Sequence, residues 1–181
     1  MKSTLRFTIT LLLSIFINTS KTTAQNVPFS SGPIPLCDTV TFTANISGIG
    51  TLYPPNVGSF WTYSFTSLLI NITSNHPQTL KISITSPQGT TLLLSAFNGA
   101  GGSNYTNCNF DYFTSTNITT GSAPFTNNWA PQGGPLSTFD WENADGIWTI
   151  EIIDTLCAGG GVGRGGGVPT PGFFNGGSGA S

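Results

Sequence analysis

His76 is the chain's single histidine and is therefore the first residue to test for catalytic chemistry. Catalysis by a Ser/His/Asp triad needs an imidazole that is hydrogen-bonded to a nucleophile and oriented by a carboxylate. The nucleophile segment is missing, because the sequence contains neither Gly-Thr-Ser-Met-Ala nor Gly-x-Ser-x-Gly. His76 also falls in a predicted turn before a strand, where packing or hydrogen bonding is the commoner role. We therefore predict no catalytic residue in this chain.

Acidic side chains offer a second kind of chemistry, since carboxylate and backbone oxygens on loops are the ligands that calcium prefers. Five of the seven acidic residues fall on predicted loops or strand ends: Asp111, Asp140, Glu142, Asp145 and Asp154. Acids on the loops of a β-domain are more often simply solvated, so both interpretations stay open from the residues alone. Calcium is the only cofactor that the sequence suggests.

The cysteines favour a structural role over a metal site. Cys37, Cys108 and Cys157 include no C-x-x-C pair, and His76 is far from each of them in the sequence. An oxidising compartment would permit one disulfide and leave one thiol over, and the spacing does not say which two residues pair. Free buried thiols are the alternative.

A carbohydrate-binding platform needs aromatic rings exposed on one face of the domain. The candidate residues for it are Trp61, Tyr63, Trp129 and Trp141. Alternation along a strand places Trp61 and Tyr63 on the same side. Core packing explains such pairs more often, because large aromatic residues dominate the burial of small domains.

The N-terminus predicts export. Lys2 and Arg6 precede a stretch of apolar, Thr and Ser residues, Phe7 to Ile17, and small residues that suit a cleavage site follow at 22–24. The stretch has 11 residues, well short of the roughly 20 that cross a bilayer as a helix. We predict that residues 1–24 are a signal peptide cleaved after Ala24, and that the product is secreted or extracytoplasmic with no membrane span.

Removal of the signal changes the charge balance. Only Lys81 and Arg164 then remain against seven acidic residues, a net charge of −5. Nucleic acid and anionic membrane surfaces are poor partners for such a chain. Charged residues are 7% of the whole sequence, so Thr, Ser and Asn must solvate the surface, which favours strands and turns over helices.

Apolar residues at every second position predict antiparallel strands over 40–46, 80–85 and 147–154, with Trp148, Ile150 and Ile152 on one face of the last. Ser86-Pro87-Gln88-Gly89 predicts a tight hairpin turn, since proline presets φ at the second turn position. Further strands are expected over 59–65 and 68–73, a loop-rich region over 95–145, and few helices. The fold class is all-β.

The C-terminal residues 158–181 differ in composition. Eleven of these 24 residues are glycine, and Arg164 is their one charge. Such a segment lacks the apolar surface needed to hold itself folded, so it predicts a flexible tail or an incomplete last strand.

The order of the motifs resembles the P domain, also called the Homo B domain, which follows the catalytic domain of kexin- and furin-like subtilisin-type proteases. In that family a histidine precedes a strand ending in Ser-Pro-x-Gly-Thr, and a later Gly-x-Trp strand leads to an aspartate. The matching segments here are His76, Leu80–Thr85, Ser86-Pro87-Gln88-Gly89-Thr90, Gly146–Ile150 and Asp154. The chain departs from the pattern at Thr79-Leu80, where the family often has Asp-Leu, and lacks a recognisable closing tryptophan strand after Cys157.

The resemblance implies a jelly-roll-like β-sandwich over 25–157, between the signal peptide 1–24 and the Gly-rich tail 158–181. It implies a non-catalytic module that supports or targets a subtilisin-type serine endopeptidase, or another exported protein at the cell surface. Asp111 and Asp154 match acidic positions of the family pattern and are the candidate calcium ligands. Two alternatives remain: an adhesive or carbohydrate-binding module, and part of a serine endopeptidase whose catalytic domain lies elsewhere.

Overall fold

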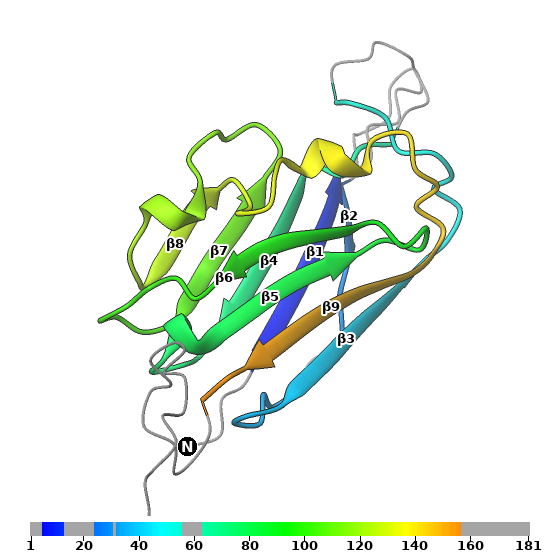
Figure 1. Cartoon of the computed structure of the whole chain (residues 1–181). Coiled ribbons are helices and arrows are strands. Elements are labelled where there is room, and N and C mark those ends of the chain that lie inside the picture. Colours follow the sequence, from blue (N-terminus) through cyan, green and yellow to red (C-terminus); the bar gives the residue numbers. More distant parts are fainter. Residues whose placement is uncertain (1–4, 13–23, 31, 56–62, 157–181) are drawn as a thin grey trace, which may run out of the picture.

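The computed structural model describes residues 5–12, 24–30, 32–55 and 63–156, with side chains described from residue 28 onward (Figure 1). Nine strands are present in this part of the chain: β1 (Leu5–Leu12), β2 (Ala24–Val27), β3 (Thr39–Ile46), β4 (Ser67–Ile72), β5 (Leu80–Thr85), β6 (Thr91–Ala96), β7 (Tyr105–Asp111), β8 (Phe125–Trp129) and β9 (Gly146–Asp154). Its only helical elements are three single 3-10 turns: η1 (Pro77–Thr79), η2 (Ile118–Thr120) and η3 (Leu136–Phe139). The all-β prediction is confirmed.

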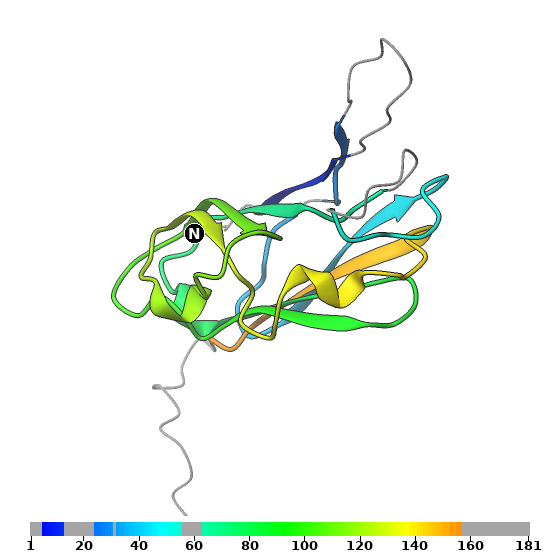
Figure 2. The same ribbon diagram turned by 90° about the horizontal axis from the view of Figure 1, so that it is seen from above.

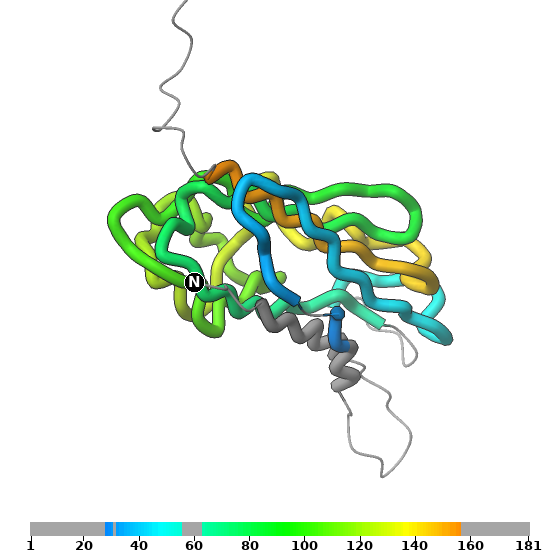
Figure 3. Tube along the Cα trace, turned by 90° about the horizontal axis from the view of Figure 1, so that it is seen from below, coloured from blue at the N-terminus to red at the C-terminus, as the bar shows by residue number. Residues whose placement is uncertain are grey.

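The strands form two sheets packed as a sandwich, and the two layers are seen from above and below in Figures 2 and 3. The first sheet has the order β2-β1-β4-β7-β8 and the second the order β3-β9-β5-β6. All neighbouring strands are antiparallel except β7 and β8, which are parallel.

The strands predicted from period-two patterns are present, and their apolar faces are buried. In β3, Phe42, Ala44 and Ile46 are buried while the residues between them are exposed. In β9, Trp148 is 2% exposed, and Ile150 and Ile152 are fully buried. The predicted placement of these three β9 residues on the core face is therefore confirmed.

The hairpin of β5 and β6 is also confirmed. The amide of Gly89 donates to the carbonyl oxygen of Ser86 at 3.0 Å, and the amide of Ser86 donates to the carbonyl oxygen of Thr90 at 2.9 Å. Gly89 has φ of +90°, a conformation that glycine adopts without a Cβ clash.

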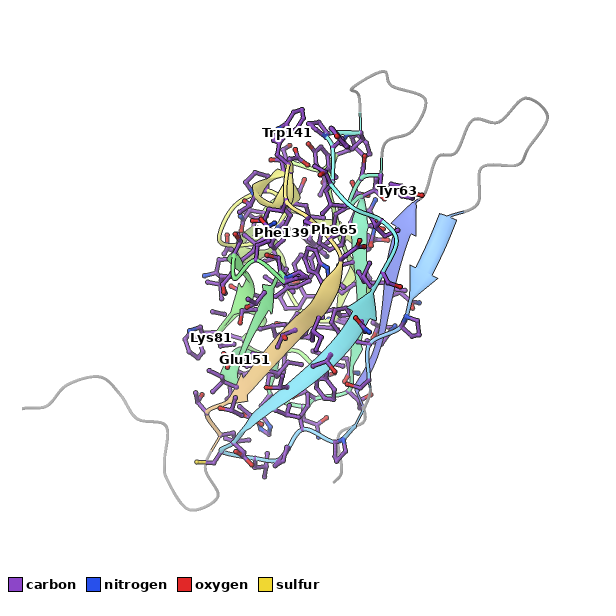
Figure 4. The ribbon with its side chains drawn as sticks, turned by 90° about the vertical axis from the view of Figure 1, so that its right-hand side faces the viewer. Tyr63, Phe65, Lys81, Phe139, Trp141 and Glu151 are labelled. Carbon is purple, nitrogen blue, oxygen red and sulfur yellow. The ribbon has the colours of Figure 1, made fainter. Side chains whose placement is uncertain are left out.

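Three aromatic rings fill the core where β9 begins. Trp148 lies edge-on to Phe65 and Phe139, with ring centroids 5.3 and 5.1 Å apart, and its indole nitrogen donates to the carbonyl oxygen of Ala144 at 2.9 Å. Figure 4 shows Phe65 and Phe139 side by side in the sandwich interior. Burying such rings stabilises small domains strongly, and the hydrogen bond satisfies the one polar atom of the indole.

Other parts of the chain add to or depart from the expectations. Between its loops, the loop-rich region 95–145 contains two strands that the sequence patterns did not predict, β7 and β8. The expected strand over 59–65 is not continuous: its described residues make one bridge, from Tyr63 to Leu52, and then no strand. Residues 5–12, which fall inside the predicted signal peptide, pair with β4 as strand β1, and cleavage after Ala24 stays a prediction. The Gly-rich tail lies outside the described residues.

Candidate functional site

The antiparallel register places the candidate site residues at two opposite ends of the sandwich. Asp154 ends β9 and pairs with Leu80, where β5 begins. Asp111 ends β7 and pairs with Ser67, where β4 begins, while Ile72 at the other end of β4 leads directly into the loop before β5. We call the first the Asp154 end. The second, which contains Asp111 and also Trp141, is called the Trp141 end. The length of β7 separates them by roughly 20 Å, so Asp111 and Asp154 do not share one ion.

Asp154 is 7% exposed, and its carboxylate accepts hydrogen bonds from within the chain. Its Oδ1 accepts a hydrogen bond from the hydroxyl of Thr79 at 2.7 Å and another from the amide of Leu156 at 2.9 Å. The Thr79 hydroxyl also lies 2.9 Å from the carbonyl oxygen of His76, with which it shares its single proton. The backbone amide of Asp154 donates to the carbonyl oxygen of Asp38 at 2.9 Å. Asp154 therefore joins the end of β9, the turn η1 and the segment before β3.

His76 lies at the start of η1 with an exposed side chain. Its backbone makes the contacts: its amide donates to the hydroxyl of Ser74 at 3.0 Å, and its carbonyl oxygen accepts from the amide of Thr79 at 3.0 Å. Among the hydrogen bonds of the described residues, none involves the imidazole. The geometry is that of a turn residue whose ring faces solvent.

At the Trp141 end, an exposed tryptophan is held in an unusual backbone conformation. Trp141 is 62% exposed and has φ of +72°, which is strained for a bulky residue. Its amide donates to the carbonyl oxygen of Leu52 at 2.7 Å, and the amide of Leu52 donates to the carbonyl oxygen of Glu142 at 2.8 Å. The ring stands edge-on to Tyr53 at 5.2 Å between centroids, at the tip of the molecule (Figure 4).

A tyrosine and an aspartate form a hydrogen-bonded pair at the same end. The hydroxyl of Tyr112 donates to Oδ2 of Asp140 at 2.7 Å. Burial, followed by the hydrogen bond to Asp140 and its negative charge, raises the pKa of Tyr112 to about 12. Burial also raises the pKa of Asp140, an effect that the hydrogen bond from Tyr112 opposes. Phe113, 63% exposed, lies edge-on to Tyr112 at 5.4 Å.

The acids gathered at the Trp141 end each accept a hydrogen bond from their own surroundings: Asp111 from the amide of Phe113, Asp140 from Tyr112, Glu142 from the hydroxyl of Thr90, and Asp145 from the amide of Ile49. Within the described ranges, no three Asp, Glu, His or Cys residues lie close enough together to hold a metal ion. Calcium at Asp111 or at Asp154 stays a prediction.

Residues 65–163 match the family model of the proprotein convertase P-domain, and the match covers more than half of the chain's 181 residues. The chain belongs to the P-domain family. P domains are non-catalytic accessory domains that usually accompany a protease domain, and the family is typical of extracellular proteases. Comparison with curated proteins and with solved structures gives no match.

The family match divides the two ends unequally. It includes Thr79, Asp111, Trp141 and Asp154, but it begins at Phe65, so Tyr53 lies outside it. The match therefore covers Thr79 and Asp154 but not Asp38 at the Asp154 end, and Trp141 but not Tyr53 at the Trp141 end. Over the described residues, this P domain has no helix with the length and apolar character needed to cross a membrane.

Two of the other aromatic residues proposed for a carbohydrate platform, Trp129 and Tyr63, make no ring contact with Trp141. Trp129 is partly buried in β8, where its indole nitrogen donates to the carbonyl oxygen of Thr126 at 2.7 Å. Tyr63 packs partly buried against the core, and Trp61 lies outside the described residues. Sequence reasoning missed Tyr53, which only the hydrogen bonds between Leu52 and the segment 141–142 bring beside Trp141.

Proposed function

We propose that this chain is an exported, non-catalytic P-domain module that supports or targets a subtilisin-type serine endopeptidase or another exported protein. The observation that carries the proposal is the family match over residues 65–163, which includes the β5–β6 hairpin and the core strand β9. The catalytic domain would lie on another polypeptide or on a longer parent protein. A subtilisin-type domain needs on the order of 250 residues, which exceeds the whole chain.

A module of this kind acts by binding the folded protease domain. Any contact made to the folded but not the unfolded protease raises the protease's stability by mass action. The module's own fold must then be intact, and its contribution is lost when the core around Trp148 is disrupted. No proton transfer or nucleophile in this chain is required.

The test is co-production of the exported chain with a subtilisin-type catalytic domain encoded in the same genome. We expect a higher yield of active protease and a higher melting temperature than for the catalytic domain alone. Trp148→Ala should abolish the gain, whereas Ile147→Ala, which alters an exposed side chain of the same strand, should keep it. If the yield and melting temperature of the protease are the same with and without the chain, the proposal is contradicted.

The chain alone should cleave no peptide bond. The measurement is incubation of the purified chain with an unstructured protein substrate, with and without calcium, beside the His76→Ala variant. Cleavage that disappears in the His76 variant would overturn the non-catalytic proposal. A calcium-dependent rise in melting temperature without cleavage would instead support an ion site at Asp111 or Asp154.

Export itself is part of the proposal. N-terminal sequencing of material recovered outside the cytoplasm should begin at Gln25. An intact Met1 in that material would contradict removal of residues 1–24 while leaving the family assignment untouched.

A second candidate function is glycan binding at the Trp141–Tyr53 pair, favoured by the 62% exposure of Trp141 and its strained backbone. An exposed indole stacks on the apolar face of a sugar ring, and the acids at this end favour a neutral glycan over an anionic one. Binding on a glycan panel that Trp141→Ala removes and Ile147→Ala keeps would support this function. The absence of binding to any glycan on the panel would contradict this second function.

A further inference from the structure

Strand β1 occupies an edge that the exported chain does not keep. β1 pairs antiparallel with β4 over six residues, from Leu5 opposite Ile72 to Thr10 opposite Ser67. All of β1 lies inside residues 1–24, the predicted signal peptide, and outside the family match. Cleavage after Ala24 would therefore remove a strand that lies second in the order of the first sheet.

The sequence of β1 fits a strand position as well as a signal peptide. Leu5, Phe7, Ile9 and Leu11 alternate with Arg6, Thr8 and Thr10. The apolar set occupies the register positions opposite the buried β4 residues: Leu5 opposite Ile72, Phe7 opposite Ile70 and Ile9 opposite Leu68. Directly opposed residues on antiparallel strands interact on the same face of a sheet, so the β4 edge suits a strand with apolar residues at every second position.

Removal of β1 would leave β4 as the border of the first sheet. Its other edge is already taken by β7, and β2 has no partner in the described sheet except β1. Leu68, Ile70 and Ile72 are 0–1% exposed in the structure, and β4 would then present unpaired backbone groups beside them. An apolar edge of this kind is a template for pairing with another chain.

The other borders of the two sheets differ from β4. β3 exposes threonines at 39, 41 and 43, and β8 exposes Asn127 and Asn128. β6 is as apolar as β4, but the loop at 132–133 covers its free edge: the amides of Gln132 and Gly133 donate to the carbonyl oxygens of Leu94 and Leu93 at 3.0 and 2.9 Å. Among the described strands, β4 is therefore the apolar border that removal of β1 would leave uncovered.

We propose that, after export, the β4 edge accepts an antiparallel strand with apolar residues at alternate positions, supplied by a different polypeptide. The strand adds to the sheet by main-chain hydrogen bonds, and its apolar residues take the register positions of Leu5, Phe7 and Ile9. The partner is recognised by its extended, period-two pattern. This inference rests on the removal of residues 1–24 and not on the protease-supporting role.

The experiment titrates the exported chain, which begins at Gln25, with a synthetic peptide of residues 5–12 carrying two added lysines for solubility. We expect saturable one-to-one binding and a rise in melting temperature. A peptide with Thr8→Pro lacks a central backbone donor and should bind at least about tenfold more weakly. The unprocessed chain, whose own β1 fills the edge, should also bind at least about tenfold more weakly.

Hydrogen exchange at the backbone amides of Ser67–Ile72 gives a second readout. The amides on the β1 side should exchange rapidly in the exported chain and become protected when the peptide is added. Protection without peptide would overturn the proposal, because another part of the chain, or a second copy of it, would then already cover the edge. Equal binding of the Thr8→Pro peptide, or no binding of either peptide, would also overturn it. Because the tested chain starts at Gln25, these results are independent of whether export occurs as predicted.

Discussion

The hydroxyl of Thr79 lies 2.7 Å from Oδ1 of Asp154, across the start of β5 and the end of β9. The family resemblance places Thr79 at a position where an aspartate is common, and in this chain a hydroxyl faces the Asp154 carboxylate there. A hydroxyl satisfies the buried carboxylate without a cation, since a hydrogen bond to an ionised group is among the stronger ones. At the Asp154 end, the neutral hydroxyl of Thr79 therefore donates a hydrogen bond to the carboxylate of Asp154.

Thr79→Val should lower the free energy of unfolding by about 1.5 to 3 kcal/mol, because it removes a donor to a mostly buried carboxylate while keeping the side-chain shape. The measurement is urea unfolding of the exported chain at neutral pH. Thr79→Ser keeps the hydroxyl and is the matched control. Equal stability of the valine variant and the wild type would show that the Leu156 amide and solvent satisfy the Asp154 carboxylate without the Thr79 hydroxyl.

Thr79→Asp should make the chain respond to calcium. A second carboxylate beside Asp154 adds repulsion between like charges, which lowers the melting temperature without calcium and is relieved by a hard cation with oxygen ligands. Thr79→Asn provides the neutral control of the same shape. The prediction is contradicted if millimolar calcium leaves the melting temperature of the Thr79→Asp variant unchanged.

Trp148→Ala should cost about 3 to 5 kcal/mol of unfolding free energy, the range for emptying a large buried aromatic site. Trp148 is 2% exposed and lies against Phe65 and Phe139, so neighbouring rings would be left around a cavity. Ile147→Ala, next in sequence but 59% exposed, should change stability by less than about 0.5 kcal/mol. A loss below about 1 kcal/mol for the tryptophan variant would mean that the site collapses or faces solvent.

Period-two patterns predicted β3, β5 and β9 because each buries one face against the other sheet. The same reasoning missed β7, where the buried Tyr105 and Cys108 are three residues apart. The break has a physical cause: the register with β4 shifts there, and Asn107 has φ of +49°. A bulge adds a residue and moves the apolar positions out of alternation.

β8 and the Trp141–Tyr53 pair were each missed for a reason of their own. β8 is a short border strand whose Asn127 and Asn128 are the polar residues that favour turns in a sequence. Trp141 and Tyr53 are far apart in the sequence, and their contact depends on the positive φ of Trp141, which no local pattern predicts. Asp154 was found as a candidate through the family resemblance, which also identified Thr79 as a departure.

Asp140 gives the fold a pH dependence of unusual sign. Burial raises its pKa in the folded state, so the folded chain binds this proton at a higher pH than the unfolded chain, whose aspartate pKa is about 3.9. The contribution of this group is therefore full below the unfolded pKa and is lost as pH rises through the folded pKa. Asp140→Asn, which cannot ionise, should be at least as stable as the wild type at pH 7 and should lose that advantage at pH 3.

Tyr112→Phe tests the same site from the donor side. Without the Tyr112 hydroxyl, the ionised Asp140 loses the hydrogen bond that lowers its pKa. The variant should lose more stability at pH 7 than at pH 3, relative to the wild type, in parallel denaturant titrations. Identical losses at the two pH values would show that Asp140 is solvated well enough to ionise without the tyrosine.

The three thiols should separate into one free cysteine and one disulfide. Cys108 is fully buried and free, and burial raises its pKa to about 12, so its thiolate is scarce at neutral pH and it does not enter thiol exchange in the folded chain. The remaining two are Cys37, directly before Asp38, and Cys157, three residues after Asp154. The backbones of Asp38 and Asp154 are joined by a hydrogen bond of 2.9 Å. We therefore predict a Cys37–Cys157 disulfide in the exported chain.

Mass spectrometry after alkylation without reductant tests this pairing. A cross-linked peptide should contain Cys37 and Cys157, and Cys108 should be alkylated only after the chain is unfolded. A bridge closing a loop of more than 100 residues stabilises by about 4 to 5 kcal/mol at most, so the Cys37→Ser variant should unfold at lower denaturant while Cys108→Ala keeps the bridge. A disulfide that includes Cys108 would contradict the prediction, because it would require the core between β4 and β7 to open before oxidation.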